Sequence, residues 1–320
     1  MPSYSGVWNL VQQYQAQAQG LWPLPPVIPR GIFGGGITTT FDNIIDYITI
    51  GTTGNAIDFG DLTSPRSQLA GCASSIRGLF GGGENAVTSP INIIDYVTID
   101  TTGNAIDFGD LLSGDGRQMG ACSSSTRGVF AGGRDTTFQN TIQYVTIAST
   151  GNATNFGQLT ISVQSLAGCA SSTRGIFGGG IDSTSTFTNV ISYITIATTG
   201  NATSFGQLTL ARRTPASCSN SVTGLFAGGD GNSGNSNVID YITIASTGNA
   251  TDFGDLTVAK ASLAGCSSST RGVFGGGYTT VAVNTIDYVT IASTGNATSF
   301  GQLTAARYNL AACSNSHGGL

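Results

Sequence analysis

The sequence predicts an all-β protein whose architecture is a six-bladed β-propeller with four antiparallel strands in each blade. Three observations lead to this prediction. A repeat of about 48 residues occurs six times between residues 30 and 320, each repeat contains four short strand-like segments, and the chain ends on a segment that the first repeat lacks. Repeats of this length with four strands in each are typical of propellers.

Aromatic residues and cysteines mark the repeat. Each unit has a Phe before a run of small residues, a Tyr 14 to 16 residues later, and a second Phe 12 residues after that Tyr. In the last unit these are Phe274, Tyr288 and Phe300. A cysteine recurs at spacings of 50, 47, 49, 48 and 47 residues: Cys72, Cys122, Cys169, Cys218, Cys266 and Cys313. The six cysteines are therefore one position of the repeat, counted six times.

The last unit shows the four predicted strands in order. Residues 263–269 are mostly small, which suits a strand near a crowded axis, and residues 271–277 run from an apolar strand into glycines. Residues 284–292 are rich in β-branched and aromatic side chains, which favour strands. A turn containing Gly295 joins them to residues 296–304 as a hairpin. No stretch inside the repeats has a useful 3.6-residue apolar period.

The ends of the repeat region predict a closed ring. The first unit begins at its second strand, residues 30–36, and the chain ends with an additional first strand, residues 310–316. Pairing of these two segments removes the open edges that unpaired strands expose. An open solenoid is the competing architecture, but it requires capping units at its ends. We therefore expect a propeller over residues 30–320, preceded by an arm over residues 1–29.

The arm contains Trp8, Tyr14 and Trp22 together with several aliphatic residues. Apolar residues outside the repeat predict that the arm docks on another protein; the alternative is that it folds back on its own propeller. The first residues lack the basic and apolar regions of a secretory signal, so we expect no cleaved signal and synthesis in the cytoplasm of the producing cell.

Composition argues against two classes of partner. Only 9% of the residues are charged and the net charge is −5, whereas nucleic-acid-binding proteins usually present a basic surface. No apolar run reaches the roughly 18 residues of a membrane helix. Neither nucleic-acid binding nor membrane insertion is therefore expected.

The residue pattern does not support a catalytic or metal site. The cysteines lack the close pairs of a zinc site, so we expect six buried, reduced thiols and no metal or cofactor. The only histidine, His317, lies three residues from the end, and a hydrolytic triad needs a base beside its nucleophile. We therefore do not expect an enzyme. A pair of carboxylates across the ring stays open as a route to a carbohydrate-active enzyme.

The loops at one face of the ring differ strongly between repeats, whereas the turns at the other face scarcely change. Because neighbouring strands are antiparallel, the loops between strands two and three share a face with the links between units. Variation confined to one face of a repeat array often marks a binding surface; the alternative is ordinary drift of surface loops. Aromatic residues in these loops are candidate contacts: Phe41, Phe138, Phe187 and Tyr278.

The same face is predicted to carry a basic ring before the first strand of five units: Arg66, Arg117, Arg212, Lys260 and Arg307, with Gln164 at the sixth position. Such donors suit carboxylate, sulfate or phosphate groups, so an acidic surface glycan is a candidate ligand. The alternative is that these residues only tie adjacent blades through backbone carbonyls. A second basic ring, at the opposite face, is expected to be structural: Arg30, Arg77, Arg127, Arg174 and Arg271.

The repeat resembles kelch-type repeats, which have a Gly-Gly pair after an apolar strand, a Tyr in the next strand and an aromatic residue in the fourth. The resemblance covers residues 30–320, but Phe stands where Trp is typical in strand four and strand one lacks the usual His. Residues 249–256 and 268–277 also resemble kelch-like structural proteins of tailed phages, especially those that infect cyanobacteria. Residues 5–8 and 13–16, with Trp22-Pro23, look like the N-terminal leader of such proteins.

The resemblance implies a virion structural protein that is present as a homo-oligomer or in many copies. Its expected role is that of a tail-fibre or baseplate-associated propeller that binds the host cell surface, with a glycan as the ligand. The arm then docks the propeller to other virion proteins. A capsid decoration or tail-assembly protein without a host ligand is one alternative, and a carbohydrate-active enzyme is another.

Overall fold

The computed structural model describes residue 14 and residues 27–87, 89–112 and 116–320. Within these ranges the chain forms strands joined by turns and loops, so the all-β prediction is confirmed. Trp8 and Trp22 of the predicted docking arm lie outside the described residues, whereas Tyr14 is described and is 75% exposed. The described part of the chain contains no helix with the length and apolar character that a membrane span requires.

Six antiparallel sheets of four strands each account for most of the fold. They are numbered here in chain order, with the strands given from the inner edge outwards. Sheet 1 contains β29 (Ala311–Ser314), β1 (Arg30–Gly34), β2 (Ile44–Thr49) and β3 (Ile57–Asp61). Sheet 2 contains β4 (Ala70–Ala73), β5 (Arg77–Gly81), β6 (Ile93–Thr98) and β7 (Ile106–Asp110). Sheet 3 contains β8 (Gly120–Ser123), β9 (Arg127–Ala131), β10 (Thr141–Thr146) and β11 (Thr154–Gln158).

The other three sheets repeat this pattern. Sheet 4 contains β13 (Ala167–Ala170), β14 (Arg174–Gly178), β16 (Val190–Thr195) and β17 (Thr203–Gln207). Sheet 5 contains β19 (Ala216–Ser219), β20 (Thr223–Ala227), β23 (Val238–Thr243) and β24 (Thr251–Asp255). Sheet 6 contains β25 (Ala264–Ser267), β26 (Arg271–Gly275), β27 (Thr285–Thr290) and β28 (Thr298–Gln302).

Two small sheets lie in the loop regions. One pairs β12 (Val163–Gln164) with β15 (Ile181–Asp182). The other contains β18 (Arg212–Arg213), β21 (Asp230–Gly231) and β22 (Gly234–Asn235). Both join a link between repeats to the loop between strands two and three of a repeat, so they shape the face on which the loops vary.

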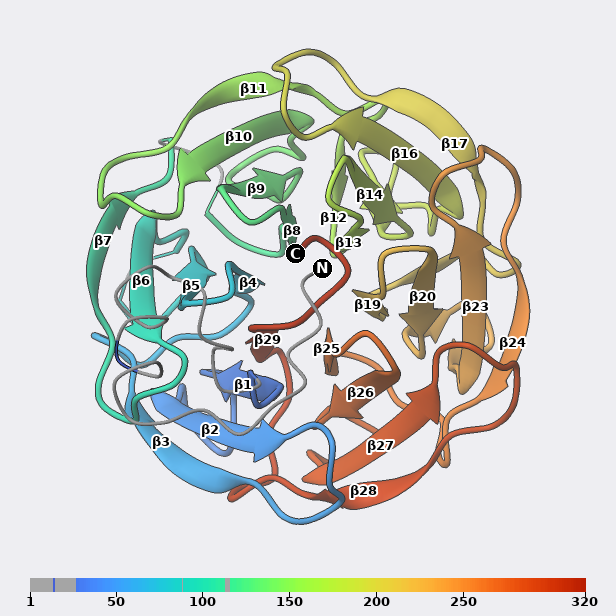
Figure 1. Ribbon diagram of the computed structural model, residues 1–320. Helices are drawn as coiled ribbons and strands as arrows, with labels where there is room; N and C mark the ends of the chain where they lie inside the picture. Colours follow the sequence, from blue (N-terminus) through green and yellow to red (C-terminus); the bar gives the residue numbers. More distant parts are fainter. Residues whose placement is uncertain (1–13, 15–26, 88, 113–115) are drawn as a thin grey trace.

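The six large sheets surround a common centre, with their shortest strands innermost (Figure 1). Each inner strand contacts the inner strands of the two neighbouring sheets, in the order β4, β8, β13, β19, β25, β29 and back to β4. Strand β29, near the end of the chain, pairs with β1 in the register Gly31 to Ser314 through Gly34 to Ala311. These features are compatible with a β-propeller.

The core lies between neighbouring sheets and repeats the same contacts. The Tyr of strand three meets the Phe of strand four edge to face, as in the pair Tyr241 and Phe253, with ring centroids 6.0 Å apart. All six cysteines are free and buried, so the expectation that they pack as small core residues is confirmed. The Sγ of Cys266 lies 2.5 Å from the place where a Cβ on Gly31 of the next sheet would sit, so only glycine fits there. Burial raises the pKa of the Cys169 and Cys313 thiols to about 12.

The second basic ring joins the sheets at the face with uniform turns. The guanidinium of Arg30 lies 4.8 Å from the centre of the Tyr47 ring in its own sheet and donates to the carbonyl oxygen of Ile99 in the next sheet at 3.1 Å. The equivalent arginines make the same two contacts: Arg77, Arg127, Arg174 and Arg271. The structural role expected for this ring is therefore confirmed.

Candidate binding surface

The first basic ring does not face solvent in four of its five members. Arg66, Arg212, Lys260 and Arg307 are 0% exposed, and each forms an ion pair with an aspartate on strand three of the same repeat. The N···O distances are 2.9 to 3.0 Å. A buried cation paired in this way cannot reach a ligand at the surface. The expectation of an exposed basic ring is therefore corrected, and the alternative role in tying blades together fits these four residues.

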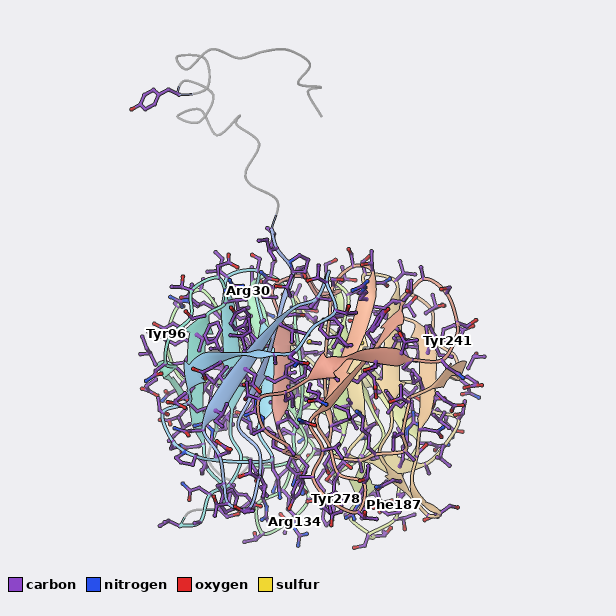
Figure 2. All side chains as sticks on the ribbon, turned by 90° about the horizontal axis from the view of Figure 1, so that it is seen from below. Arg30, Tyr96, Arg134, Phe187, Tyr241 and Tyr278 are labelled. Carbon is purple, nitrogen blue, oxygen red and sulfur yellow. The ribbon has the colours of Figure 1, made fainter. Side chains whose placement is uncertain are left out.

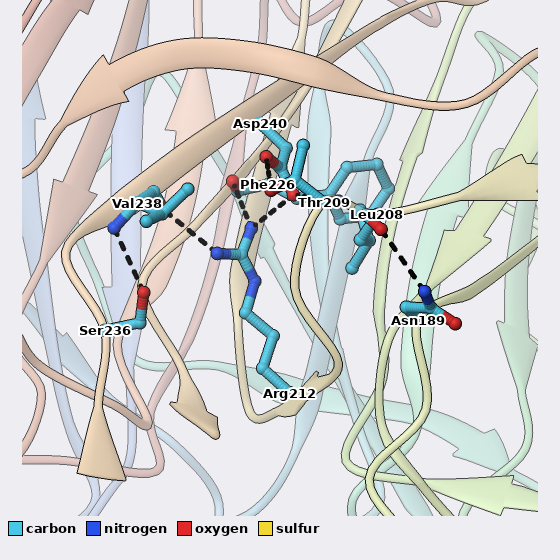
Figure 3. A network of polar contacts seen from close by, with 8 residues as sticks. All are labelled: Asn189, Leu208, Thr209, Arg212, Phe226, Ser236, Val238 and Asp240. Carbon is cyan, nitrogen blue, oxygen red and sulfur yellow. Dashed lines mark hydrogen bonds and ion pairs between the residues drawn. The ribbon is translucent and has the colours of Figure 1, made fainter. Parts of the chain in front are cut away.

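Arg212 illustrates how a buried cation connects two neighbouring sheets (Figure 3). Its guanidinium donates to the carboxylate of Asp240 at 3.0 Å and to the carbonyl oxygens of Phe226 and Val238, all in sheet 5. Its own carbonyl oxygen accepts from the backbone N–H of Gly180, which follows strand two of sheet 4. One residue therefore joins two sheets, through its backbone on one side and its side chain on the other.

The partner aspartate completes the junction. Thr209, just beyond the last strand of sheet 4, donates its hydroxyl to Asp240 at 2.5 Å and its backbone N–H to the same carboxylate at 3.1 Å. Burial lowers the pKa of the Arg212 guanidinium, and the charge of Asp240 opposes that change. Burial likewise lowers the pKa of the Lys260 ammonium, against the effect of Asp287. These ion pairs are tolerated in the protein interior because each charged group also has hydrogen-bonded partners.

The buried cation and the buried carboxylate are present or absent together. The carbonyl oxygen of Arg212 accepts from the glycine that follows strand two of the preceding sheet. The equivalent acceptor is the carbonyl oxygen of Gly116 in repeat 3 and of Val163 in repeat 4. In those repeats the aspartate is replaced by Gln143 and Ser192, which still bind the preceding link at 2.7 and 2.6 Å. An unpaired buried charge is strongly destabilising, so neither partner is kept without the other.

Two residues of the predicted basic ring lie one position beyond the place of the buried cations. Arg117 and Gln164 follow Gly116 and Val163, so they are not equivalents of the buried cations. Arg117 lies at the surface, where it forms an ion pair with Glu84 at 2.8 Å with both side chains partly exposed. It is the only member of the predicted basic ring that stays accessible within the described residues.

A ring of six polar residues lies next to the buried pairs, at the inner end of the links between repeats. Each has a left-handed backbone with φ between 51° and 59°, although none is glycine: Gln68, Gln118, Ser165, Thr214, Ser262 and Asn309. The backbone N–H of each donates to the carbonyl oxygen of the preceding member at 2.7 to 3.2 Å, and Gln68 donates to Asn309. The hydrogen bonds thus form a closed cycle, which we call the polar ring.

Just outside the polar ring, each repeat pairs one link residue with one loop residue through the backbone. The six pairs have different chemistry: Ser67 with Glu84, Arg117 with Arg134, Gln164 with Ile181, Arg213 with Asp230, Ala261 with Tyr278, and Tyr308 with Ile37. We call these twelve residues the rim. Strand three of the same repeats is nearly uniform, for example Ile-Ile-Asp-Tyr-Ile-Thr in β2 and Val-Ile-Asp-Tyr-Ile-Thr in β23. The repeats therefore differ in sequence at the rim, although their third strands are nearly the same.

One side of the rim opens into a pocket of about 450 Å³. Its walls include Tyr278, Tyr308, Asn235 and the ion pair between Arg213 and Asp230, and five of the six members of the polar ring line it as well. The side chains of Arg213 and Asp230 are 3.0 Å apart and 45% and 24% exposed. The rings of Tyr278 and Tyr308 lie 5.1 Å apart between centroids.

The predicted aromatic contacts occupy different positions at this face. Tyr278 is 40% exposed and lines the pocket, whereas Phe41, Phe138 and Phe187 are half-buried beside their own loops. The guanidinium of Arg134 lies 5.1 Å from the Phe138 ring, and that of Arg213 lies 5.5 Å from the Phe187 ring. Figure 2 shows Arg134, Phe187 and Tyr278 at one end of the molecule and Arg30 near the other.

Residues near the end of the chain enter the centre of the ring of sheets at the opposite face (Figure 1). The Nε2 of His317 lies 2.8 Å from the carbonyl oxygen of Ala73, and its Nδ1 accepts from the backbone N–H of Gly319 at 3.0 Å. The backbone N–H of Gly318 donates to the carbonyl oxygen of Ser219. The only histidine is thus a packing residue beside the inner strands β4 and β8.

The sequence alone did not single out most of the pocket. Tyr308, Asn235, Arg213 and Asp230 were not among the candidate residues. For Tyr308, Arg213 and Asp230 the signal is divergence at rim positions, which lie five residues before the cysteine or four residues after the first Phe of each repeat. Asn235 is not a rim residue and is identified by its place in the pocket. Among the described residues, no group of three or more His, Cys, Asp or Glu side chains is placed to hold a metal ion.

Comparison with known proteins does not assign a family. No protein-family model matches the chain, and no curated protein is significantly similar to it in sequence. The geometry of the rim and the pocket is therefore the basis for a functional proposal.

Proposed function

We propose that the protein is a closed, six-bladed β-propeller in which each large sheet is one blade. Three observations support this architecture. The inner strands contact one another in a cycle, β29 pairs with β1, and the polar ring forms a cycle of six hydrogen bonds, one for each repeat. In such a ring the last strand of the chain completes the first blade and removes the open edge.

We further propose that the propeller is a rigid binding module that displays its rim to the surface of a host cell. The rim carries this proposal, because neighbouring repeats share their core residues yet carry six different residue pairs around the axis. Identical pairs would be sufficient if the rim only supported the fold. A fixed array of different side chains around one axis suits recognition of a surface through several simultaneous contacts.

The kelch-like repeats and their resemblance to phage structural proteins favour a place in the virion. In this proposal the protein is a tail-fibre or baseplate-associated component, present in several copies, and residues 1–29 attach it to other virion proteins. It acts by binding, without a catalytic step. A capsid decoration or tail-assembly protein is the second candidate, although the varied rim does not favour it.

Adsorption to cells tests the binding function. The purified full-length protein, labelled with a fluorophore, is mixed with a panel of bacterial cells that includes cyanobacteria. We expect saturable binding to a subset of strains, and loss of that binding when the accessible rim residues Arg134, Asp230 and Tyr278 are replaced together by Ala. A matched control replaces three surface residues far from the rim: Ile57, Ile106 and Val222, which are 58%, 60% and 57% exposed. Binding to no strain, or binding unaffected by the rim substitutions, would contradict the proposal.

A further inference from the structure

We propose that the pocket lined by Tyr278, Tyr308, Asn235, Arg213 and Asp230 is a binding site for a neutral saccharide. This inference rests on the proposed function and names the site and the ligand class within the rim. The pocket volume of about 450 Å³ falls within the range of about 300 to 1,000 Å³ that is typical of small-ligand sites.

The aromatic wall supplies the apolar contact that sugar rings require. Tyr278 exposes 40% of its surface and shares the wall with Tyr308. The two rings are inclined at 57°, so they do not stack flat on each other. A tyrosine offers a broad apolar face for the C–H groups of a pyranose and a hydroxyl for its polar edge.

Asn235 provides a polar group that is fixed in place. Its Nδ2 donates to the carbonyl oxygens of Tyr278 and Thr279, each at 2.9 Å. These two bonds join strand β22, in the loop of sheet 5, to the loop of sheet 6 and hold the amide plane beside the aromatic wall. A side chain held in advance loses little conformational entropy when a ligand binds.

Arg213 and Asp230 add planar donors and acceptors on the same side of the pocket. Both Nε and Nη2 of Arg213 lie 3.0 Å from Oδ2 of Asp230. The paired guanidinium and carboxylate present hydrogen-bonding edges suited to neighbouring hydroxyl groups. Such groups distinguish a saccharide from a purely apolar ligand.

The charge of the pocket selects the class of saccharide. Arg213 and Asp230 are the only charged side chains among the described residues that line it, and they neutralise each other. Four of the cations proposed above as donors to an acidic glycan are buried and paired with aspartates. A bound carboxylate or sulfate would compete with Asp230 for Arg213 and leave one charge without a partner. A neutral saccharide avoids this cost.

The polar ring makes the floor of the pocket rigid. Thr214, Ser262 and Asn309 line it with left-handed backbones and donate to one another in sequence around the axis. Left-handed conformations of non-glycine residues cost free energy and persist where the surrounding structure holds them. The floor therefore keeps its shape without a ligand, as expected for a preformed site.

The test is a glycan array that contains neutral oligosaccharides and their uronic-acid and sulfated counterparts, followed by calorimetry with the best soluble oligosaccharide. The full-length protein is compared with Tyr278→Ala and with Val222→Ala, a control at an exposed residue outside the rim and the pocket. We expect neutral saccharides to bind, Tyr278→Ala to weaken binding at least tenfold, and Val222→Ala to leave it within twofold. Circular dichroism and melting of both variants establish that they are folded.

Three outcomes would overturn the inference. They are a preference for acidic saccharides, unchanged affinity of Tyr278→Ala, and an array without any binding although the protein adsorbs to cells. In that last case the proposed function stands while its saccharide ligand is excluded. Absence of adsorption to any cell in the panel described above is the separate result that removes the proposed function itself.

Discussion

The guanidinium of Arg307 forms an ion pair with the carboxylate of Asp46 at 2.9 Å, although 261 residues separate them in the sequence. Both side chains are fully buried. Thr304 adds a hydroxyl bond to the same aspartate at 2.5 Å. These contacts join the last link of the chain to sheet 1, in the same way that the ion pair of Arg212 and Asp240 joins the link between sheets 4 and 5 to sheet 5.

Replacing one partner of this pair should be strongly destabilising. Arg307→Val leaves the buried carboxylate of Asp46 without its cation, and we expect a loss of about 3–5 kcal/mol in the free energy of unfolding. Repeat 4 already holds the uncharged combination Val163 and Ser192 at the equivalent positions. The double variant Arg307→Val with Asp46→Ser should therefore recover most of the loss. Urea unfolding measures all three proteins, and a double variant as unstable as the single one would contradict the role of charge pairing.

Removal of the last strand should destabilise the protein as a whole. A chain that ends after Asn309 lacks β29, so β1 loses its inner partner and the inner strands no longer contact one another in a cycle. We expect the melting temperature to fall by more than 10 °C, or folding to fail, because one open sheet edge exposes the core of two sheets. A chain that ends after Ser316 is the control, since it keeps the strand. Equal melting of the two truncated proteins would show that pairing with β29 does not stabilise the fold.

His317 should make stability depend on pH. Its Nδ1 accepts a bond from Gly319 and its Nε2 bonds to Ala73, an arrangement that needs the neutral ring. Burial lowers the pKa of His317 in the folded protein. The unfolded chain then binds the proton first, so this contribution to stability is present above about pH 6.5 and is lost as the pH falls below it. Melting of the wild type and His317→Gln from pH 8 to pH 5 measures this effect, and parallel curves would count against it.

The six cysteines should be unreactive in the folded protein. All are buried, and burial raises the pKa of Cys169 and Cys313 to about 12, so almost no thiolate is present at pH 8. A chromogenic thiol reagent should label less than one cysteine per chain under native conditions and all six in denaturant. Rapid labelling of the folded protein would show that the cysteines are accessible.

The repeat pattern was sufficient to predict the strands and the hairpin that joins strands three and four. Tyr288 and Phe300, twelve residues apart in the sequence, meet because a hairpin brings strands three and four together. The spacing and the hairpin were predicted from the sequence, whereas the edge-to-face contact of the two rings is a finding of the structure. The same reasoning placed the cysteines in the core, because a small residue at a fixed position of every repeat suits the crowded inner strands.

The burial or exposure of the basic residues could not be predicted from local spacing. Arg66 and Arg117 both precede the first strand of a repeat, yet the first is buried beside Asp95 and the second is partly exposed beside Glu84. They precede the cysteines of their repeats by six and five residues, a difference that the sequence contains but whose consequence for burial it does not reveal. Hydrogen bonds to the preceding sheet set the true alignment.

By itself, the sequence determined that six similar units fold into short antiparallel strands, since hydrophobic periodicity and turn residues act over a few neighbouring positions. Only the tertiary structure decided which polar groups are exposed. Burial of Arg66 and exposure of Tyr278 depend on what a neighbouring sheet and link place against them, and those partners come from other repeats. The pocket beside the axis exists because residues from the links and loops of five successive sheets, among them Asp230, Tyr278 and Tyr308, meet around it.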